Sequence, residues 1–310
     1  MKVKPKKELG QHFLKDEGIA IRIVNTALDG YDCTKSLLEI GPGTGVLTKH
    51  LLDEMSSRPG MDLRLVEIDH EAAEFLRRAY PRTREILFEE DFLKADLGKM
   101  FPGAFDVVGN FPYNISSQIF FKLLDFRDRV PQIVCMLQKE VAGRLASAPG
   151  KKAYGVLSVL FQAWYDIDYL FEVGSQCFEP QPKVQSAVIR LRRNSRNALP
   201  CDEIMFKKIV KTGFNQRRKT LRNSLKPMLA AMAAGADISR FNAGDGARTG
   251  YGTLKRDGTI IGNGHGAAAE KSRSATLHDL LASPMLDLRP EQLSVEDFIK
   301  LTGSVEEIGN

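Results

Sequence analysis

The stretch that decides the fold of this chain is Leu37-Leu38-Glu39-Ile40-Gly41-Pro42-Gly43-Thr44-Gly45. Its apolar start predicts a buried strand, and the glycine turn leads into a predicted helix over residues 46–55. Glycines let the backbone approach a ligand closely, and the N-terminus of the following helix favours a carboxylate or phosphate. The stretch therefore predicts a strand–turn–helix unit with a ligand at the carboxyl end of the strand.

Apolar runs and helical patterns alternate along most of the first two thirds of the chain. This alternation predicts an α/β fold, with a mainly parallel sheet covered by helices on both faces. The last two runs lack a long helix between them, which predicts an antiparallel pair at one edge. An amphipathic helix is predicted over residues 71–80. The seven predicted strands cover residues 37–40, 63–66, 86–89, 105–108, 133–137, 165–171 and 184–191.

The C-terminal third predicts a small α-helical domain, so we expect a first domain over residues 1–199 and a second over 200–310. Residues 202–229 are helical in pattern, and Asn215 is a candidate cap for a second helical segment there. Ser294 and Asp297 form a capping box, with Leu293 and Phe298 at the two staple positions.

Between these helical patterns, residues 231–283 are rich in Ala, Gly, Ser and charge. Eight glycines lie between Gly244 and Gly266. Long loops of this type are uncommon inside compact domains. We expect a flexible insertion there, with one Asp-Gly hairpin signal at Asp257-Gly258.

Bulk composition excludes several classes of protein. The chain has 310 residues, 43% hydrophobic and 27% charged, as in ordinary globular proteins. No apolar run approaches bilayer length, and residues 1–7 lack the apolar segment of a signal peptide. For these reasons we expect a cytoplasmic protein. We also expect no metal site, because the cysteines show no metal-ligand spacing. They are Cys33, Cys135, Cys177 and Cys201.

Positive charge is unevenly distributed. The formal net charge is +5, yet the segment from Arg190 to Lys226 holds twelve Lys or Arg against two acids. A second basic group lies at Lys2, Lys4, Lys6 and Lys7. Such local positive fields attract polyanions, and nucleic acid is the usual partner. A solvated helix face is the alternative.

The glycine turn resembles a dinucleotide fingerprint but departs from it. That fingerprint requires a third glycine at position 46, where this chain has Val46. What remains is Glu-x-Gly-x-Gly-x-Gly, starting at Glu39, a form typical of S-adenosylmethionine binding. Its leading acid can engage the ammonium group of that ligand. A purely structural glycine turn is the alternative.

Polar residues also follow the next three predicted strands. Glu67 is placed to accept both ribose hydroxyls of a nucleoside, and Asp91 to accept from an adenine amino group. At the fourth strand, Asn110-Phe111-Pro112-Tyr113 offers an amide oxygen and a flat ring, which suit an exocyclic amine and its base. A helix cap at Asp91 and an ordinary Asn-x-Pro turn are the alternatives. Together these residues predict a nucleoside cofactor across the carboxyl edge of the sheet, beside an amine-binding loop.

In this order, the motifs resemble the ribosomal RNA adenine dimethyltransferases of the KsgA type. The resemblance covers residues 6–229 and resumes near residues 289–291. Outside the cofactor motifs it rests on three segments. They are Leu9-Gly10-Gln11-His12-Phe13-Leu14, Phe178-Glu179-Pro180-Gln181-Pro182-Lys183-Val184, and residues 214–225.

This resemblance implies a Rossmann-like class I methyltransferase domain with a seven-stranded sheet, followed by a helical RNA-binding domain. It assigns Asn110, Phe111, Tyr113 and Phe178 to the target adenine, with Leu9 and Phe13 at the entrance. His12 stands where family members carry Asn or His. The RNA-contacting residues it implies are Arg217, Arg218, Lys219 and Arg222. The cofactor-site residues it implies are Gln11, His12, Leu14, Glu39, Gly41, Gly43, Glu67, Ile68, Asp91, Phe92 and Asn110.

The implied activity is S-adenosylmethionine-dependent N6,N6-dimethylation of two adjacent adenosines in the 3′-terminal hairpin loop of 16S rRNA. The implied partner is the immature small ribosomal subunit, approached by a monomer. Three alternatives stay open from the sequence. They are a large-subunit rRNA methyltransferase of the resistance type, a non-catalytic assembly factor, and a DNA adenine methyltransferase. The motif at residues 214–225 argues against the first, and the absence of a large target-recognition domain against the last.

Overall fold

The computed structural model describes residues 3–238, 241 and 277–309. Within this range the chain forms two compact units. The first comprises residues 1–146 and 164–197, and the second residues 147–163 and 198–310. The segment around α7 (Val156–Gln162) therefore groups with the C-terminal helices. The hairpin expected near Asp257-Gly258 and most of the expected flexible insertion lie outside the described residues.

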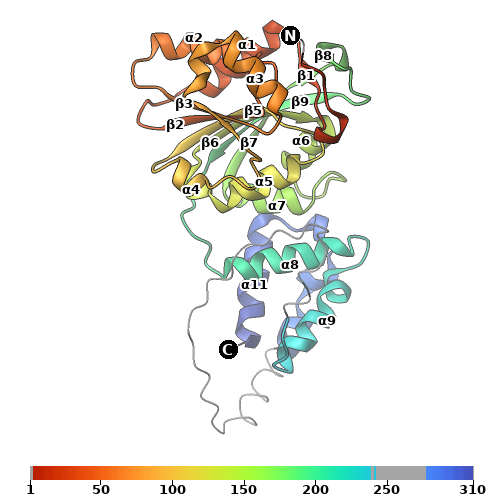
Figure 1. The fold of residues 1–310 in the computed structure, drawn as a ribbon. Helices are drawn as coiled ribbons and strands as arrows, with labels where there is room; N and C mark the ends of the chain where they lie inside the picture. Colours follow the sequence, from red (N-terminus) through yellow and green to blue (C-terminus); the bar gives the residue numbers. More distant parts are fainter. Residues whose placement is uncertain (1–2, 239–240, 242–276, 310) are drawn as a thin grey trace. The chain divides into compact units, whose positions relative to one another are not determined.

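A seven-stranded sheet in the order β4-β3-β2-β5-β6-β9-β7 forms the centre of the first unit (Figure 1). Strands β2 to β6 are parallel neighbours, while β9 pairs antiparallel with both β6 and β7. The predicted antiparallel pair at one edge is confirmed. The strands are β2 (Ser36–Ile40), β3 (Asp62–Glu67), β4 (Leu87–Glu89), β5 (Phe105–Asn110), β6 (Gln132–Gln138), β7 (Tyr165–Val173) and β9 (Ser186–Arg193).

Helices cover both faces of this sheet, with α1, α2 and α3 on one side and α4 and α5 on the other (Figure 1). A separate pair of short strands, β1 and β8, ties the N-terminal segment to residues 178–179. The bounds are β1 (Phe13–Leu14), β8 (Phe178–Glu179), α1 (Glu17–Leu28), α2 (Thr48–Ser57), α3 (His70–Ala79), α4 (Leu97–Met100), α5 (Ser116–Asp125) and α6 (Lys139–Leu145).

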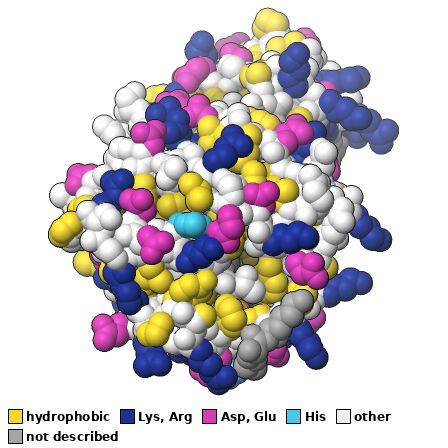
Figure 2. Space-filling model, turned by 90° about the horizontal axis from the view of Figure 1, so that it is seen from above, with side chains coloured by type: hydrophobic (Ala, Val, Ile, Leu, Met, Phe, Trp, Pro, Cys, Tyr) yellow, Lys and Arg dark blue, Asp and Glu magenta, His cyan; other side chains and the backbone are white. Residues whose placement is uncertain are grey.

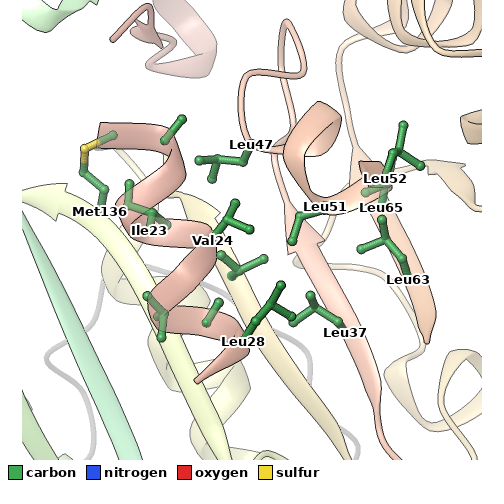
Figure 3. Packing of buried hydrophobic residues seen from close by; sticks show 14 of the residues in the cluster. Ile23, Val24, Leu28, Leu37, Leu47, Leu51, Leu52, Leu63, Leu65 and Met136 are labelled. Atoms are coloured by element: carbon green, nitrogen blue, oxygen red, sulfur yellow. The ribbon is translucent and has the colours of Figure 1, made fainter. Parts of the chain in front are cut away.

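The core of the first unit forms where α1 and α2 pack on the sheet. Figure 3 shows Ile23 of α1 beside Met136 of β6, while Val24 and Leu28 of the same helix point toward leucines of α2 and β2. These side chains recur with helical spacing on α1, so one face of the helix is apolar. On the face that Figure 2 shows, basic and acidic side chains of the described residues are interspersed.

The second unit is helical. It contains α7, α8 (Glu203–Asn215), α9 (Leu221–Ala233) and α11 (Val295–Gly309), and residues 277–282 are also helical. The predicted capping box of α11 is confirmed, because Ser294 and Asp297 each accept the other's backbone N–H. The predicted cap at Asn215 is wrong. Asn215 is the last residue of α8, and a four-residue turn places Thr220 at the N-cap of α9.

No helix in the described part of the chain combines the length and the hydropathy that a bilayer crossing needs. Likewise, residues 3–238, 241 and 277–309 contain no group of three or more His, Cys, Asp or Glu arranged to hold a metal ion.

Shortening a buried side chain of α1 tests where the core lies. Ile23 is fully buried, so Ile23→Ala should lower the free energy of unfolding by about 2–5 kcal/mol. Trp164, the one Trp of the chain, lies in the first unit and supplies the fluorescence signal in urea. Ile21 on the same helix is 43% exposed, and Ile21→Ala should change that free energy by less than about 0.5 kcal/mol. Equal losses in both variants would contradict this packing.

Candidate active site

A cavity of about 210 Å³ lies in the first unit, at the carboxyl ends of β2, β3, β4 and β5. Open α/β sheets bind their ligands at this edge. The structure brings most of the predicted site residues to its wall, together with Leu9 and Phe13. The predicted cofactor-site and adenine-site residues found there are Gln11, His12, Gly41, Gly43, Glu67, Ile68, Asp91, Phe92, Asn110, Phe111 and Tyr113.

Asn110 ends β5, where its side chain is held in one orientation. Its Nδ2 donates a hydrogen bond of 2.9 Å to the carbonyl oxygen of His12. That bond leaves Oδ1 as the acceptor of the amide, and no hydrogen bond from the described residues engages it. Phe111 N–H donates to Met136 O at 2.9 Å, which fixes the backbone just after the strand. The loop therefore presents a fixed acceptor oxygen at the cavity.

Gly109, the residue before Asn110, is required by a close approach of two backbones. A Cβ at this position would lie 2.6 Å from the carbonyl oxygen of Ile40 and would also press on the Phe111 ring. Any larger residue would separate β5 from the end of β2. This glycine therefore keeps the two motif-bearing strand ends together.

Tyr113 is fixed at both ends of its side chain. Its ring stacks on that of His12, with centroids 5.2 Å apart and planes 29° apart. Its hydroxyl forms a short hydrogen bond with Ser186 Oγ on β9. Burial raises the pKa of the Tyr113 hydroxyl above its ordinary value, so the ring is a neutral platform. The His12 ring is fixed in turn by a bond of 2.7 Å between Nδ1 and Pro180 O.

Glu67 is buried at the end of β3 and accepts backbone N–H groups from both sides. Gly43 donates to Oε2 and Asp69 donates to Oε1, each at 2.9 Å. Gly43 has a φ of 57°, in the left-handed region, which glycine adopts without strain. Burial is the main reason that the pKa of Glu67 is raised. The carboxylate thus joins the glycine turn to the end of the next strand.

Sequence reasoning missed the residue that holds the N-terminal segment over the cavity. Asp69, which is buried, accepts from Lys6 Nζ at 2.6 Å and from Gln11 Nε2 at 2.9 Å. Asn114 donates to Glu8 O at 3.0 Å. The only signal in the sequence was that Asp69 follows a strand end, and that signal names no partner 58 or 63 residues away. Gln11 therefore faces the cavity because Asp69 anchors it.

Three predicted ligand residues do not line the cavity. Leu14 and Phe178 are buried in the hydrophobic core around α1, where they face each other in the β1–β8 pair. Glu39 lies within β2 and is 1% exposed, and Thr48 Oγ1 donates to its carboxylate at 2.8 Å. Their contacts with a ligand remain predictions, and contact through Phe178 requires its ring to leave the core.

The four cations predicted for RNA lie on the second unit in two different environments. Arg217 pairs with Glu291 at 3.7 Å, and Arg222 pairs with Asp287 at 2.7 Å. Arg218 and Lys219 are exposed, and neither forms an ion pair with a described residue. The turn between α8 and α9 therefore presents Arg218 and Lys219 to solvent, while the other two cations pair with carboxylates of their own unit.

The fold is that of the class I S-adenosylmethionine-dependent methyltransferases. A sequence model of the family described as "Ribosomal RNA adenine dimethylase" matches residues 2–246. The chain therefore belongs to this family of S-adenosylmethionine-dependent enzymes, as its motifs predict.

Curated relatives extend the match over nearly the whole chain. A protein of Parabacteroides distasonis is 50% identical, covering 97% of this chain and 93% of its own length. One of Cytophaga hutchinsonii is 54% identical over 73% of this chain and 85% of its own length. Each is named "Ribosomal RNA small subunit methyltransferase A".

Two solved structures share the fold. A dimethyladenosine transferase from Plasmodium falciparum has a TM-score of 0.69 and 24% identity, covering 96% of this chain and 98% of its own. The 23S rRNA methyltransferase ErmE has a TM-score of 0.58 and 23% identity, covering 94% and 99%. At these identities the likeness concerns the fold alone, and it does not separate the two substrates.

Because of the buried carboxyl of Glu39, we expect the free energy of unfolding to depend on pH. Burial raises its pKa to about 8 from an ordinary value of 4.5. Its stabilising contribution is therefore complete below pH 4.5 and is lost as the pH rises through 8. Across this window, the free energy of unfolding of the wild type should fall relative to Glu39→Gln, by at most about 1.4 kcal/mol per pH unit. Urea titrations followed by Trp164 fluorescence measure it, and parallel pH profiles would contradict it.

Proposed function

We propose that this chain dimethylates N6 of two adjacent adenosines in the 3′-terminal hairpin loop of 16S rRNA, within the immature small ribosomal subunit. The observation that carries the proposal is the fixed Asn110 amide, whose free oxygen lies at the wall of the cavity beside Tyr113. The small-subunit names of relatives that are 50% and 54% identical favour this substrate over large-subunit rRNA. We place the enzyme in the cytoplasm as a monomer.

The residues at the cavity support a division of roles for the cofactor. S-adenosylmethionine supplies an electrophilic methyl group. We assign its nucleoside part to Glu67, Asp91 and Phe92, which line the wall at the ends of β3 and β4. Each Glu67 oxygen already accepts one backbone N–H and, as a carboxylate oxygen, keeps a further lone pair that can accept a hydroxyl hydrogen. Gly41 and Gly43 let the backbone come close to the cofactor's amino-acid part.

For the target base, the chain acts through hydrogen bonds and stacking. The N6 lone pair of adenine is delocalised into the ring, so the amine is a weak nucleophile. Acceptance of its two hydrogens by Asn110 Oδ1 and the Phe111 carbonyl draws the nitrogen toward a tetrahedral geometry. Because both acceptors are fixed before the base arrives, alignment and electrostatics carry the catalysis. The mechanism needs no strong general base.

Stacking compensates for removing the base from its RNA. The Tyr113 ring is held by Ser186 and His12, so little side-chain entropy remains to be lost when a base stacks on it. Stacking of one base on an aromatic side chain is typically worth about 1–3 kcal/mol. The role of second aromatic wall stays with Phe178 as a proposal, because its ring is buried in the structure.

Methyl transfer from labelled S-adenosylmethionine to immature small subunits tests the function. We expect label in dimethyladenosine of the small-subunit rRNA. Asn110→Ala should reduce kcat by about 10²–10³-fold, because it removes a preorganised acceptor. Asn25→Ala, on the exposed face of α1, is the matched control and should keep the wild-type rate. Label confined to large-subunit RNA, or an unchanged rate for Asn110→Ala, would overturn the proposal.

We expect the exposed cations of the second unit to contribute to the salt dependence of RNA binding. Arg218→Gln with Lys219→Gln should weaken binding and lower the slope of log K against log salt by about 0.7–0.9 per lost phosphate contact. The reason is that these two exposed cations have no described ion-pair partner to lose. Filter binding across a salt series measures the slope.

Arg84→Gln with Lys99→Gln removes the same charge from the first unit and serves as the control. It should leave the slope near that of the wild type, because both side chains are exposed and neither belongs to the basic motif of the α8–α9 turn. A slope that is unchanged in the Arg218 and Lys219 variant would remove these residues from the RNA interface. Arg217→Gln should lower the free energy of unfolding and leave the slope near that of the wild type, since Arg217 is paired with Glu291.

A further inference from the structure

Lys122 is a buried lysine on α5 that none of the motifs includes. Its residue is 5% exposed, and its Nζ donates to the carbonyl oxygen of Phe92 at 2.6 Å and also to that of Ala95. The ammonium lies 5.0 Å from the centroid of the Phe92 ring. An ammonium is costly to bury unless it is well hydrogen-bonded, so an apolar side chain would fill this place at lower cost. A buried lysine here calls for a role beyond packing.

The two carbonyl groups belong to the loop between β4 and α4, which forms one wall of the cavity. Four consecutive residues of this loop, from Glu90 to Leu93, line the cavity. Within the loop, the backbone bonds are short-range turns from Lys94 and Ala95 to Asp91 O. Glu90 N–H reaches Glu67 O at 3.0 Å, which ties only the start of the loop to the sheet.

Lys122 reaches the loop from helix α5. Ile119, one turn earlier on α5, lines the same cavity, so the helix presents one face to both the cavity and the loop. The Lys122 ammonium also attracts the acids that surround it, Asp91, Glu90 and Asp96. The Lys122 ammonium therefore binds the carbonyl oxygens in the middle and at the end of the loop. It also balances the negative charge of the nearby carboxylates.

We propose that Lys122 is a positioning residue for the cofactor, which fixes the loop of residues 90–95 so that Asp91 and Phe92 keep their places at the cavity. It acts through these two residues and does not touch the cofactor itself. The inference rests on the proposed cofactor site, and it adds a determinant that lies behind the wall of that site. Its loss affects cofactor binding and leaves the chemistry at Asn110 intact.

Lys122→Met keeps the length of the side chain and removes both hydrogen bonds. We expect the Kd for S-adenosylhomocysteine, measured by calorimetry, and the KM for S-adenosylmethionine to rise about tenfold, equivalent to about 1.4 kcal/mol. The kcat should stay within about twofold of the wild type. Amide exchange of residues 91–95 should become faster. Lys122→Arg, which retains donors, should restore much of the affinity.

Lys208→Met is the matched control, because Lys208 is a buried lysine on α8 in the other unit. It should leave the Kd for S-adenosylhomocysteine unchanged. A wild-type Kd and wild-type exchange in Lys122→Met would overturn the proposal. If Lys122→Met does not fold, Lys122→Leu replaces it because it also lacks donors, and equal affinity in Lys122→Leu and Lys122→Arg would overturn the proposal. If Glu67→Gln also left the Kd unchanged, the cofactor site itself would be at fault.

Discussion

The structure depends on the parallel pairing of β2 with both β3 and β5. This register aligns Ile40 with Val66, and Glu39 with Val108. Because parallel strands end at the same edge, the glycine turn, Glu67 and Asn110 meet there although they lie far apart in the chain. Because Gly109 has no side chain, it can lie close to the Ile40 carbonyl oxygen, and the ends of β2 and β5 therefore stay together. The proposed ligand contacts of the glycine turn, Glu67 and Asn110 follow from that alignment.

Burial gives the polar groups at this edge a cost that the fold offsets with backbone donors. Glu67 accepts two backbone N–H groups, while Glu39 has one hydroxyl partner, and burial raises the pKa of both carboxyls. A buried carboxyl that lacks a cationic partner holds its proton more tightly. An ammonium group brought near Glu39 would favour the ionised form.

In the proposed function, the two units divide binding by the kind of contact. The cavity of the first unit offers a few fixed acceptors and an aromatic ring, which suit a nucleoside and a base. The second unit offers Arg218 and Lys219 on a turn, and such contacts position a nucleic acid without reading its sequence. Arg217 and Arg222 belong to the same motif, yet their ion pairs make them part of the unit's own packing. In the proposed function, one basic motif thus contributes both ion pairs within the unit and contacts with RNA.

The sequence by itself determined the seven strands of the main sheet, its mainly parallel character and the residues at the strand ends, because alternating apolar runs and glycine turns are local signals. Asn110, Glu67 and Asp91 could be placed at one edge for that reason. Only the tertiary structure decided that Asp69 anchors Gln11, that Phe178 and Glu39 lie behind the cavity wall, and that Lys122 holds the Phe92 loop. Asp69, Phe178 and Lys122 each join segments distant in the chain. Local periodicity carries no information about such partners, since long-range packing selects them.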